Sequence, residues 1–377
     1  GVQNTIIGGL AGDALTTGIG NVAVGYDALS TEDEHGLNVA VGASALSSLN
    51  AGANAYNVAV GYQAGINMTT GADNVIIGGL AGDALTTGSN NVAIGKEALS
   101  TEDTSSDNTA IGYRALKVQN SNSTFNTAVG KDAGLSLTSA SQCVFVGAVA
   151  GDAITTGGNN TAIGCSALGA EDEGAGNTAI GTNALITQDG GSNNTAVGLS
   201  AGGDITTGDD NTLLGQNAGH SGTNNLTTGS NNIIIGHDAA ASAVDVSNEI
   251  TLGDANISAF RCADQSIAAL SDGRDKSDVV ESPYGLEFIN KLKPVKFTWD
   301  FRPEHMSDVK QGKSRVGFIA QDLQEAMPNN DNDILDLVYE ISEDRLEAKY
   351  GNLIPVMAKA IQELSAEVKE LKKQING

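Results

Sequence analysis

The sequence is short of aromatic residues, of basic residues and of long apolar runs. Residues 1–270 contain 7 Phe, Tyr or Trp and residues 271–377 contain 8, so the first part cannot rely on large aromatic side chains for a core. Lys and Arg number 20 against 45 Asp and Glu, a net charge of −25. This balance argues against nucleic acid and anionic membranes as partners. Without a run of 18 apolar residues, no membrane insertion is expected.

Cysteine is also scarce. Cys143, Cys165 and Cys262 are odd in number and show no pairing pattern, which favours buried small-residue roles over a disulfide framework. The chain starts at Gly1, without a Met and inside a repeat, so we expect a longer parent protein.

The composition changes near residue 270. Residues 1–270 hold 5 Lys+Arg and 25 Asp+Glu, a net of −20, whereas residues 271–377 hold 15 and 20, a net of −5. The acidic part does not have the composition of a disordered chain, because Val, Ile, Leu and Ala recur at fixed positions. We therefore expect two different kinds of structure on either side of this point.

A short motif repeats through residues 1–253. Asn is followed by an apolar residue or Thr, Ala or Ile, Val or Ile, and a closing Gly, as in Asn91-Val92-Ala93-Ile94-Gly95. Most copies are 17 residues apart, and four copies form a longer repeat, since residues 8–18 return almost unchanged at 78–88. The 15 closing glycines are at positions 8, 25, 42, 61, 78, 95, 112, 130, 147, 164, 181, 198, 215, 236 and 253.

This period predicts a mainly β parallel solenoid, or β-roll, with one coil of about 17 residues per copy. Each motif predicts a strand of four to five residues bounded by Asn and Gly, and equivalent asparagines should stack in a hydrogen-bonded ladder. At about 4.8 Å per strand the stack would be on the order of 70 Å long. Both faces of such a strand are apolar, so we expect the outer face to pack on further copies of the chain.

The motif resembles the β-roll head repeats of trimeric autotransporter adhesins and similar repeats of phage tail fibres. The likeness lies in Asn-x-Ala-[Val/Ile]-Gly-x-x-Ala-Leu, found at residues 91–99 and 177–185, and extends over about two thirds of the chain. The resemblance implies a parallel homotrimer.

Acidic loops recur at one phase of the longer repeat, at residues 32–35, 102–103 and 171–173. Clustered carboxylates suit Ca²⁺, but the Gly-x-Gly-x-Asp pattern of Ca²⁺-binding β-rolls is absent. The favoured interpretation is a solvated turn that blocks aggregation of strands. We expect no metal and no cofactor.

Residues 254–270 are expected to form an adaptor, and residues 271–377 a small α+β domain. A helix is predicted at 285–289, a strand at 292–299, and a strand end followed by a helix at 316–328. The final stretch, about 353–376, predicts a coiled-coil helix. The Ile and Leu pattern of this helix by itself favours a coiled coil of two helices. That number conflicts with the homotrimer that the resemblance of the repeats implies. The seam residues are Ile354, Met357, Ile361, Leu364, Val368, Leu371 and Ile375.

The boundary itself reads Ser271-Asp272-Gly273-Arg274-Asp275-Lys276. A Ser and a Lys five positions apart are a weak signal alone. In this context they resemble the junction motif Ser-Asp-x-Arg-x-Lys of the C-terminal intramolecular chaperone domain of phage tailspikes and tail fibres. The block Gly317-Phe318-Ile319-Ala320-Gln321 and the closing helix from Tyr350 to Leu371 also match.

That resemblance implies a domain that trimerises, assists folding of the preceding fibre, and then cleaves the bond between Leu270 and Ser271. Ser271 would be the nucleophile and Lys276 its base, with Asp272 and Arg274 in support. A Lys base must be neutral, which burial would promote. The reaction would be a single-turnover autoproteolysis without an external substrate.

The expected function is therefore that of a phage tail-fibre shaft, structural or receptor-binding, with a self-cleaving chaperone. The expected partners are two further copies of the chain and a host-surface receptor or glycan. The expected location is the virion, after assembly in the host cytoplasm. A cell-surface adhesin head and a part of a polysaccharide-degrading tailspike are the alternatives; the latter needs paired carboxylates in a groove rich in aromatic residues.

Overall fold

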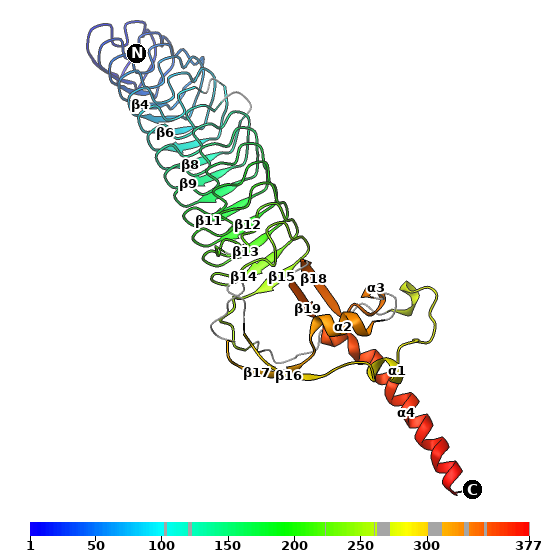
Figure 1. Cartoon of the computed structure of the whole chain (residues 1–377). Helices are drawn as coiled ribbons and strands as arrows, with labels where there is room; N and C mark the ends of the chain where they lie inside the picture. The colour runs from blue at the N-terminus through cyan, green and yellow to red at the C-terminus, as the bar shows by residue number, and fades with distance from the viewer. Residues whose placement is uncertain are drawn as a thin grey trace. The chain divides into compact units, whose positions relative to one another are not determined.

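The computed structural model forms two compact units, residues 1–254 and 255–377 (Figure 1). Each is described by itself below. The residues that the structure describes are 1–101, 104–119, 123–222, 224–259, 261, 272–300, 311–327, 332–342 and 345–376.

The first unit is a parallel β-solenoid in which every coil contributes one strand to a single sheet (Figure 1). Neighbouring coils pair in register, for example Val92 with Thr109 and Ile94 with Ile111. The predicted solenoid and its period are confirmed, although each strand has three residues rather than four to five. The strands are β1 (Thr5–Ile7), β2 (Val22–Val24), β3 (Val39–Val41), β4 (Val58–Val60), β5 (Val75–Ile77), β6 (Val92–Ile94), β7 (Thr109–Ile111), β8 (Thr127–Val129), β9 (Val144–Val146), β10 (Thr161–Ile163), β11 (Thr178–Ile180), β12 (Thr195–Val197), β13 (Thr212–Leu214), β14 (Ile233–Ile235) and β15 (Ile250–Leu252).

The closing glycines end the strands and set the distance between coils. From Gly8 to Gly236 their φ angles are +131° to +144°, a backbone conformation that residues with a Cβ rarely adopt. A Cβ on Gly25 would also lie 2.5 Å from the carbonyl oxygen of Gly42 in the next coil. Glycine is required at this position for both reasons, which explains why the motif always ends with it.

Asparagine side chains line the inside of the coils as a ladder. Asn91 is fully buried. Its Oδ1 accepts from the backbone N–H of Asn108 at 3.0 Å, and its Nδ2 donates to the Ser105 carbonyl at 2.9 Å. The predicted ladder is confirmed, with backbone groups as the main partners of the side chains. Each such bond contributes about 1 kcal/mol, and leaving its buried groups unpaired costs more.

The four-coil repeat has its origin in side-chain size. From β1 to β13, most strands have a buried Ala at the centre, whereas every fourth strand has a large residue there: Ile6, Ile76, Phe145 and Leu213. Glycines stand beside these large residues at a turn position that other coils fill with Leu. A Cβ on Gly134 or Gly151 would lie 2.7 or 2.5 Å from the Phe145 ring. Large and small residues therefore compensate within each group of four coils.

The second unit is a small α+β arrangement. Two antiparallel hairpins, β16–β17 and β18–β19, accompany short helices and one long C-terminal helix. Its elements are η1 (Gly273–Asp275), α1 (Leu286–Ile289), β16 (Val295–Thr298), β17 (Ser314–Gly317), α2 (Ala320–Ala326), α3 (Asn332–Leu335), β18 (Val338–Ser342), β19 (Arg345–Ala348), η4 (Tyr350–Asn352) and α4 (Leu353–Asn376). The predicted helices at 285–289 and 353–376 and the predicted strand at 292–299 are thus confirmed. Across the described residues, no helix combines the length and the apolarity that a membrane span requires.

Candidate functional site

The predicted cleavage junction is described from Asp272 onwards, whereas Leu270 and Ser271 lie outside the described residues. Asp272 caps the turn η1 by accepting from the Arg274 backbone N–H at 2.9 Å, and its carboxylate also binds the Arg274 guanidinium. These bonds lower the pKa of Asp272 and raise that of Arg274. Arg274 is thus engaged by Asp272, and Lys276 two residues later is exposed. Within one chain, the described part of the junction does not bury the proposed base.

The segment that follows the junction is anchored on helix α4. Glu281 forms an ion pair with Lys359, which raises the pKa of Lys359 and lowers that of Glu281. One turn further along α4, the Glu363 carboxylate accepts from the backbone N–H of Leu286 at 2.6 Å, at the first turn of α1. The junction is therefore connected to the C-terminal helix by two polar contacts. Sequence reasoning missed this pair, and its one signal was the Lys-x-x-x-Glu spacing on a helix.

The same helix presents an apolar stripe that remains exposed among the residues that the structure describes. All seven predicted seam residues of α4 are exposed; Ile354 is 64% exposed and Ile361 67%. The described inner side of α4 buries Leu353, Val356 and Ala360. A continuous exposed apolar stripe of this kind is unusual, and is typical of surfaces that bind a partner.

The outer face of the solenoid sheet is likewise only half covered. In β6, the central Ala93 is fully buried while Val92 and Ile94 on either side are half-buried. The same alternation continues along the sheet, and Ile163, Ile180 and Val197 are each more than a third exposed. The described chain therefore carries two uncovered apolar faces, one on each unit.

Two of the acidic loops differ from the predicted solvated turns, and the third, at residues 102–103, lies outside the described residues. Glu32 and Glu171 are fully buried, so that prediction is wrong for these two glutamates. The Glu171 carboxylate accepts from the backbone N–H groups of Gly174 and Gly190 and from the Gln188 side chain. These donors replace the lost hydration, so the glutamate closes the turn from inside.

The first acidic loop has a different set of partners. Glu32 accepts from the backbone N–H groups of His35 at 3.1 Å and Ala51 at 3.4 Å, and the coil position that corresponds to Gln188 is occupied by Leu49. The His35 Nδ1 lies 3.6 Å from Glu32 Oε1. Glu32, Asp33 and His35 offer ligand atoms within 4.8 Å of one another. Acidic turns of this kind are common without an ion, and we assign none.

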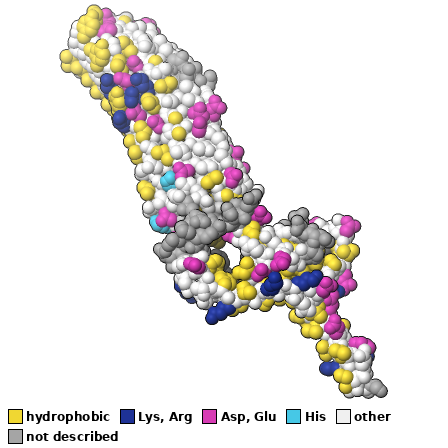
Figure 2. Space-filling model, in the orientation of Figure 1, with side chains coloured by type: hydrophobic (Ala, Val, Ile, Leu, Met, Phe, Trp, Pro, Cys, Tyr) yellow, Lys and Arg dark blue, Asp and Glu magenta, His cyan; other side chains and the backbone are white. Residues whose placement is uncertain are grey.

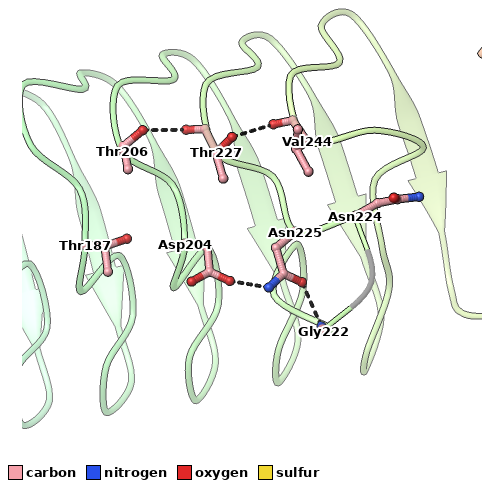
Figure 3. A pocket seen from close by; sticks show the side chains of 8 residues that line it. All are labelled: Thr187, Asp204, Thr206, Gly222, Asn224, Asn225, Thr227 and Val244. Carbon is pink, nitrogen blue, oxygen red and sulfur yellow. Dashed lines mark hydrogen bonds between the residues drawn. The ribbon is translucent and has the colours of Figure 1, made fainter. Parts of the chain in front are cut away.

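A shallow hollow of about 510 Å³ lies in the side of the solenoid near its C-terminal end (Figure 3). Its polar groups bind one another: Thr206 and Thr227 donate to the carbonyl groups of the next coils, and Asn225 donates to Asp204. Asp204 is the one carboxylate of the lining, which contains no aromatic ring. The hollow therefore lacks the carboxylate pair of a glycan hydrolase. The lining is Thr187, Asp204, Thr206, Gly222, Asn224, Asn225, Thr227 and Val244.

The C-terminal part of the chain is similar to a known protein family. Residues 271–332 match the family model of the chaperone of endosialidase. The match begins at Ser271, the first residue after the predicted cleavage site. Among curated protein sequences, none matches this chain. The chain thus combines a parallel β-solenoid with a C-terminal segment similar to an endosialidase chaperone, which is the organisation of a tailspike-like protein.

Proposed function

We propose that this chain is a segment of a phage tail fibre whose C-terminal domain assembles three copies, guides their folding and then cleaves itself off. The carrying observation is the family match that begins at Ser271, after the last closing glycine, Gly253, and the short segment 254–270. The two uncovered apolar faces support association, because α4 and the solenoid each need a cover that the described chain does not supply.

The near-identity of the coils is the physical reason for such a chaperone. Two chains shifted by one coil of 17 residues would keep most of their contacts, so the repeats alone specify their mutual register weakly. Repetitive, non-local β assemblies also fold slowly and misassemble easily. A separate trimerising domain sets one register before the coils pair. Its later removal leaves a fibre that is stable for kinetic reasons.

The proposed cleavage is an acyl shift followed by hydrolysis. The Ser271 hydroxyl attacks the Leu270 carbonyl carbon; the new C–O bond forms as the C–N bond breaks, and Lys276 passes the hydroxyl proton to the departing amine. Water then hydrolyses the ester to a Leu270 carboxylate and the Ser271 hydroxyl. Lys276 is exposed in the single chain. We therefore propose that Lys276 becomes buried only when three chains assemble, so that cleavage follows association.

Gel electrophoresis under denaturing conditions tests the cleavage. The 38.2 kDa chain should yield two products that separate between residues 270 and 271. Ser271→Ala should stop cleavage, and Lys276→Arg should do the same because a guanidinium stays protonated. Ser277→Ala, a serine of the same segment, should cleave normally. Full-length chain as the sole species after assembly would disprove the self-cleavage.

Light scattering tests the assembly. The uncut Ser271→Ala protein should have three times the mass of one chain, and residues 1–270 produced alone should fail to form the same shaft. A folded, soluble monomer obtained equally well without residues 271–377 would disprove the chaperone role.

A further inference from the structure

Basic side chains gather at one place on the acidic solenoid. Residues 1–254 contain four Lys or Arg against 24 Asp or Glu, and all four fall between positions 96 and 131. They follow β6, β7 and β8, which are consecutive in the sheet. Figure 2 shows the Lys and Arg side chains of the solenoid close together on the visible face. We call Lys96, Tyr113, Arg114, Lys117 and Lys131 the cationic patch.

Its outermost members stand in one column. Lys96, Tyr113 and Lys131 each directly follow a closing glycine of consecutive coils, and the in-register pairing of β6, β7 and β8 stacks these positions. With about 4.8 Å between strands, the two lysine positions are about 10 Å apart, with the tyrosine between them. The Lys96 and Lys131 side chains are 61% and 65% exposed, and Tyr113 is 40% exposed.

Two carboxylates hold the inner cations in place. Lys117 Nζ lies 2.7 Å from Glu97 Oε2, and Arg114 Nε donates to Asp132 Oδ1 at 2.7 Å. Asp132 is almost fully buried. These bonds lower the pKa of Glu97 and raise that of Arg114. The inner cations are thus fixed before any ligand arrives.

The outer lysines share the same two carboxylates at longer distances. Lys96 Nζ lies 3.3 Å from Glu97 Oε1, and Lys131 Nζ lies 3.6 Å from Asp132 Oδ2. Asp83 also lies near Glu97 and Lys117, and Asp152 near Asp132, so the four cations face four carboxylates. The two outer ammonium groups are much more exposed than the carboxylates with which they pair, so they are the groups of the patch that an anion in solution meets first. Each exposed ammonium has three N–H donors to offer.

The tyrosine between the lysines adds an apolar platform. The Arg114 guanidinium carbon lies 4.9 Å from the centre of the Tyr113 ring, a cation–π contact that orients the ring. An exposed aromatic face between two ammonium groups can contact the C–H face of a sugar ring while the ammonium groups bind acid groups along the same chain. The backbone positions of the two lysines are about 10 Å apart along the stack, so a polymer with repeated acid groups can contact both.

We propose that the cationic patch binds an acidic polysaccharide, with its acid groups on Lys96 and Lys131 and a sugar ring on Tyr113. This inference rests on the proposed function, since it names the chemical class of the host-surface ligand. A duplex nucleic acid fits less well, because it carries about one negative charge per 1.7 Å. The negative charge of the whole solenoid opposes such a dense polyanion more than a polymer with one acid group per sugar.

Binding of polygalacturonate, a linear polymer with a carboxylate on each sugar, tests the proposal on the assembled full-length protein. The matched neutral probe is the fully methyl-esterified polymer, and polyglutamate supplies carboxylates without sugars. We expect saturable binding of polygalacturonate that weakens at least ten-fold in 0.5 M salt relative to 0.05 M. Binding of the ester and of polyglutamate should each be at least ten-fold weaker. Polyphosphate of similar length shows whether phosphate replaces carboxylate without the sugar.

Variants locate the site. Lys96→Ala with Lys131→Ala should weaken binding at least ten-fold, and Tyr113→Ala should weaken it several-fold. The control is Thr182→Glu with Gln216→Glu, which lowers the net charge by the same two units at exposed positions of the same column, farther along the solenoid. It should bind nearly as well as the unaltered protein.

Three results would overturn the proposal: no binding of polygalacturonate, equal binding of polyglutamate, or equal loss in the control variant. If the lysine variant instead fails to assemble, the patch is a contact between copies, which also overturns it. Assembly and cleavage are measured separately by light scattering and gel electrophoresis. A failure of glycan binding therefore leaves the proposed function standing, whereas a failure of assembly does not.

Discussion

Phe145 and Gly151 fit against each other inside the solenoid: a Cβ on Gly151 would lie 2.5 Å from the Phe145 ring. Gly151 has a φ of +56°, yet the equivalent Leu116 and Leu168 adopt +48° and +50°. The backbone at this turn therefore accepts a side chain, and Gly151 is glycine because the ring occupies the space.

This fit predicts a coupled pair of substitutions. Gly151→Ala should destabilise by about 1–3 kcal/mol through overpacking, and Phe145→Ala by about 3–5 kcal/mol through a cavity. In a Phe145→Ala background, Gly151→Ala should be tolerated better, because coils with Ala at the strand centre have room for Leu at this turn position, as at Leu116 and Leu168. Thermal unfolding of the four variants of the cycle measures the coupling. Additive effects would contradict the proposed fit.

Cys143 interrupts the asparagine ladder. Its backbone N–H donates to Asn126 Oδ1 at 3.0 Å, but its own side chain has no amide for Asn160 in the next coil. Burial raises the pKa of the thiol, so the group remains protonated at neutral pH. Cys143→Asn should restore the ladder and stabilise by about 1 kcal/mol. Asn91→Ala, which removes an intact rung, should have the opposite sign in the same unfolding measurement.

The buried Glu171 depends on the Gln188 amide, which donates to Glu171 Oε2 at 2.9 Å. Gln188→Leu should destabilise by roughly 1–3 kcal/mol, because a buried acceptor loses its side-chain donor. Adding Glu171→Leu should recover much of the loss, since an apolar pair of similar volume needs no donors. Denaturant unfolding of the two variants decides the matter. A double variant that is less stable than Gln188→Leu would contradict this account.

The raised pKa of Asp83 predicts that the stability of the solenoid depends on pH. Burial raises its pKa above the ordinary 3.8, and Glu97 nearby acts in the same direction. The folded state therefore binds the proton more tightly than the unfolded state, so the stabilisation is complete below the unfolded pKa and is lost as pH rises through the folded pKa. Asp83→Asn should thus raise the unfolding temperature at pH 7 and change it little at pH 3. Asp152→Asn should behave alike, because burial raises that pKa too.

Much of the fold follows from the sequence because its signals are local and repeated. The 17-residue spacing fixes the coil, Asn and Gly mark the ends of each strand, and the apolar positions from Ile354 to Ile375 mark helix α4. The buried glutamates were missed because Glu32 and Glu171 look like any charged residue of a turn. The equivalent positions are Leu, Met or Ile in most other coils and Gln at 119 and 188, so an alignment of the coils would have shown that Glu32 and Glu171 occupy mainly apolar positions.

The candidate site was predictable in type and not in geometry. Ser271-Asp272-x-Arg274-x-Lys276 pointed to the junction, but Leu270 and Ser271 are not among the described residues. No spacing rule could place Glu363 against Leu286, because that contact joins residues 77 positions apart. The sequence shows that four basic residues fall within 36 residues of an otherwise acidic repeat. Only the stacking of the coils shows that Lys96, Tyr113 and Lys131 occupy equivalent positions in consecutive coils.

The compensation between large and small residues has a consequence for how such a fibre can evolve. Deleting the single coil that contains Gly134 removes one of the two glycines beside Phe145, whereas deleting four coils in succession preserves the order of large residues and glycines. Duplication or loss of gene segments that encode whole groups of four would therefore change the reach of the fibre without any repair of its interior, and lineages should differ in length by multiples of that unit.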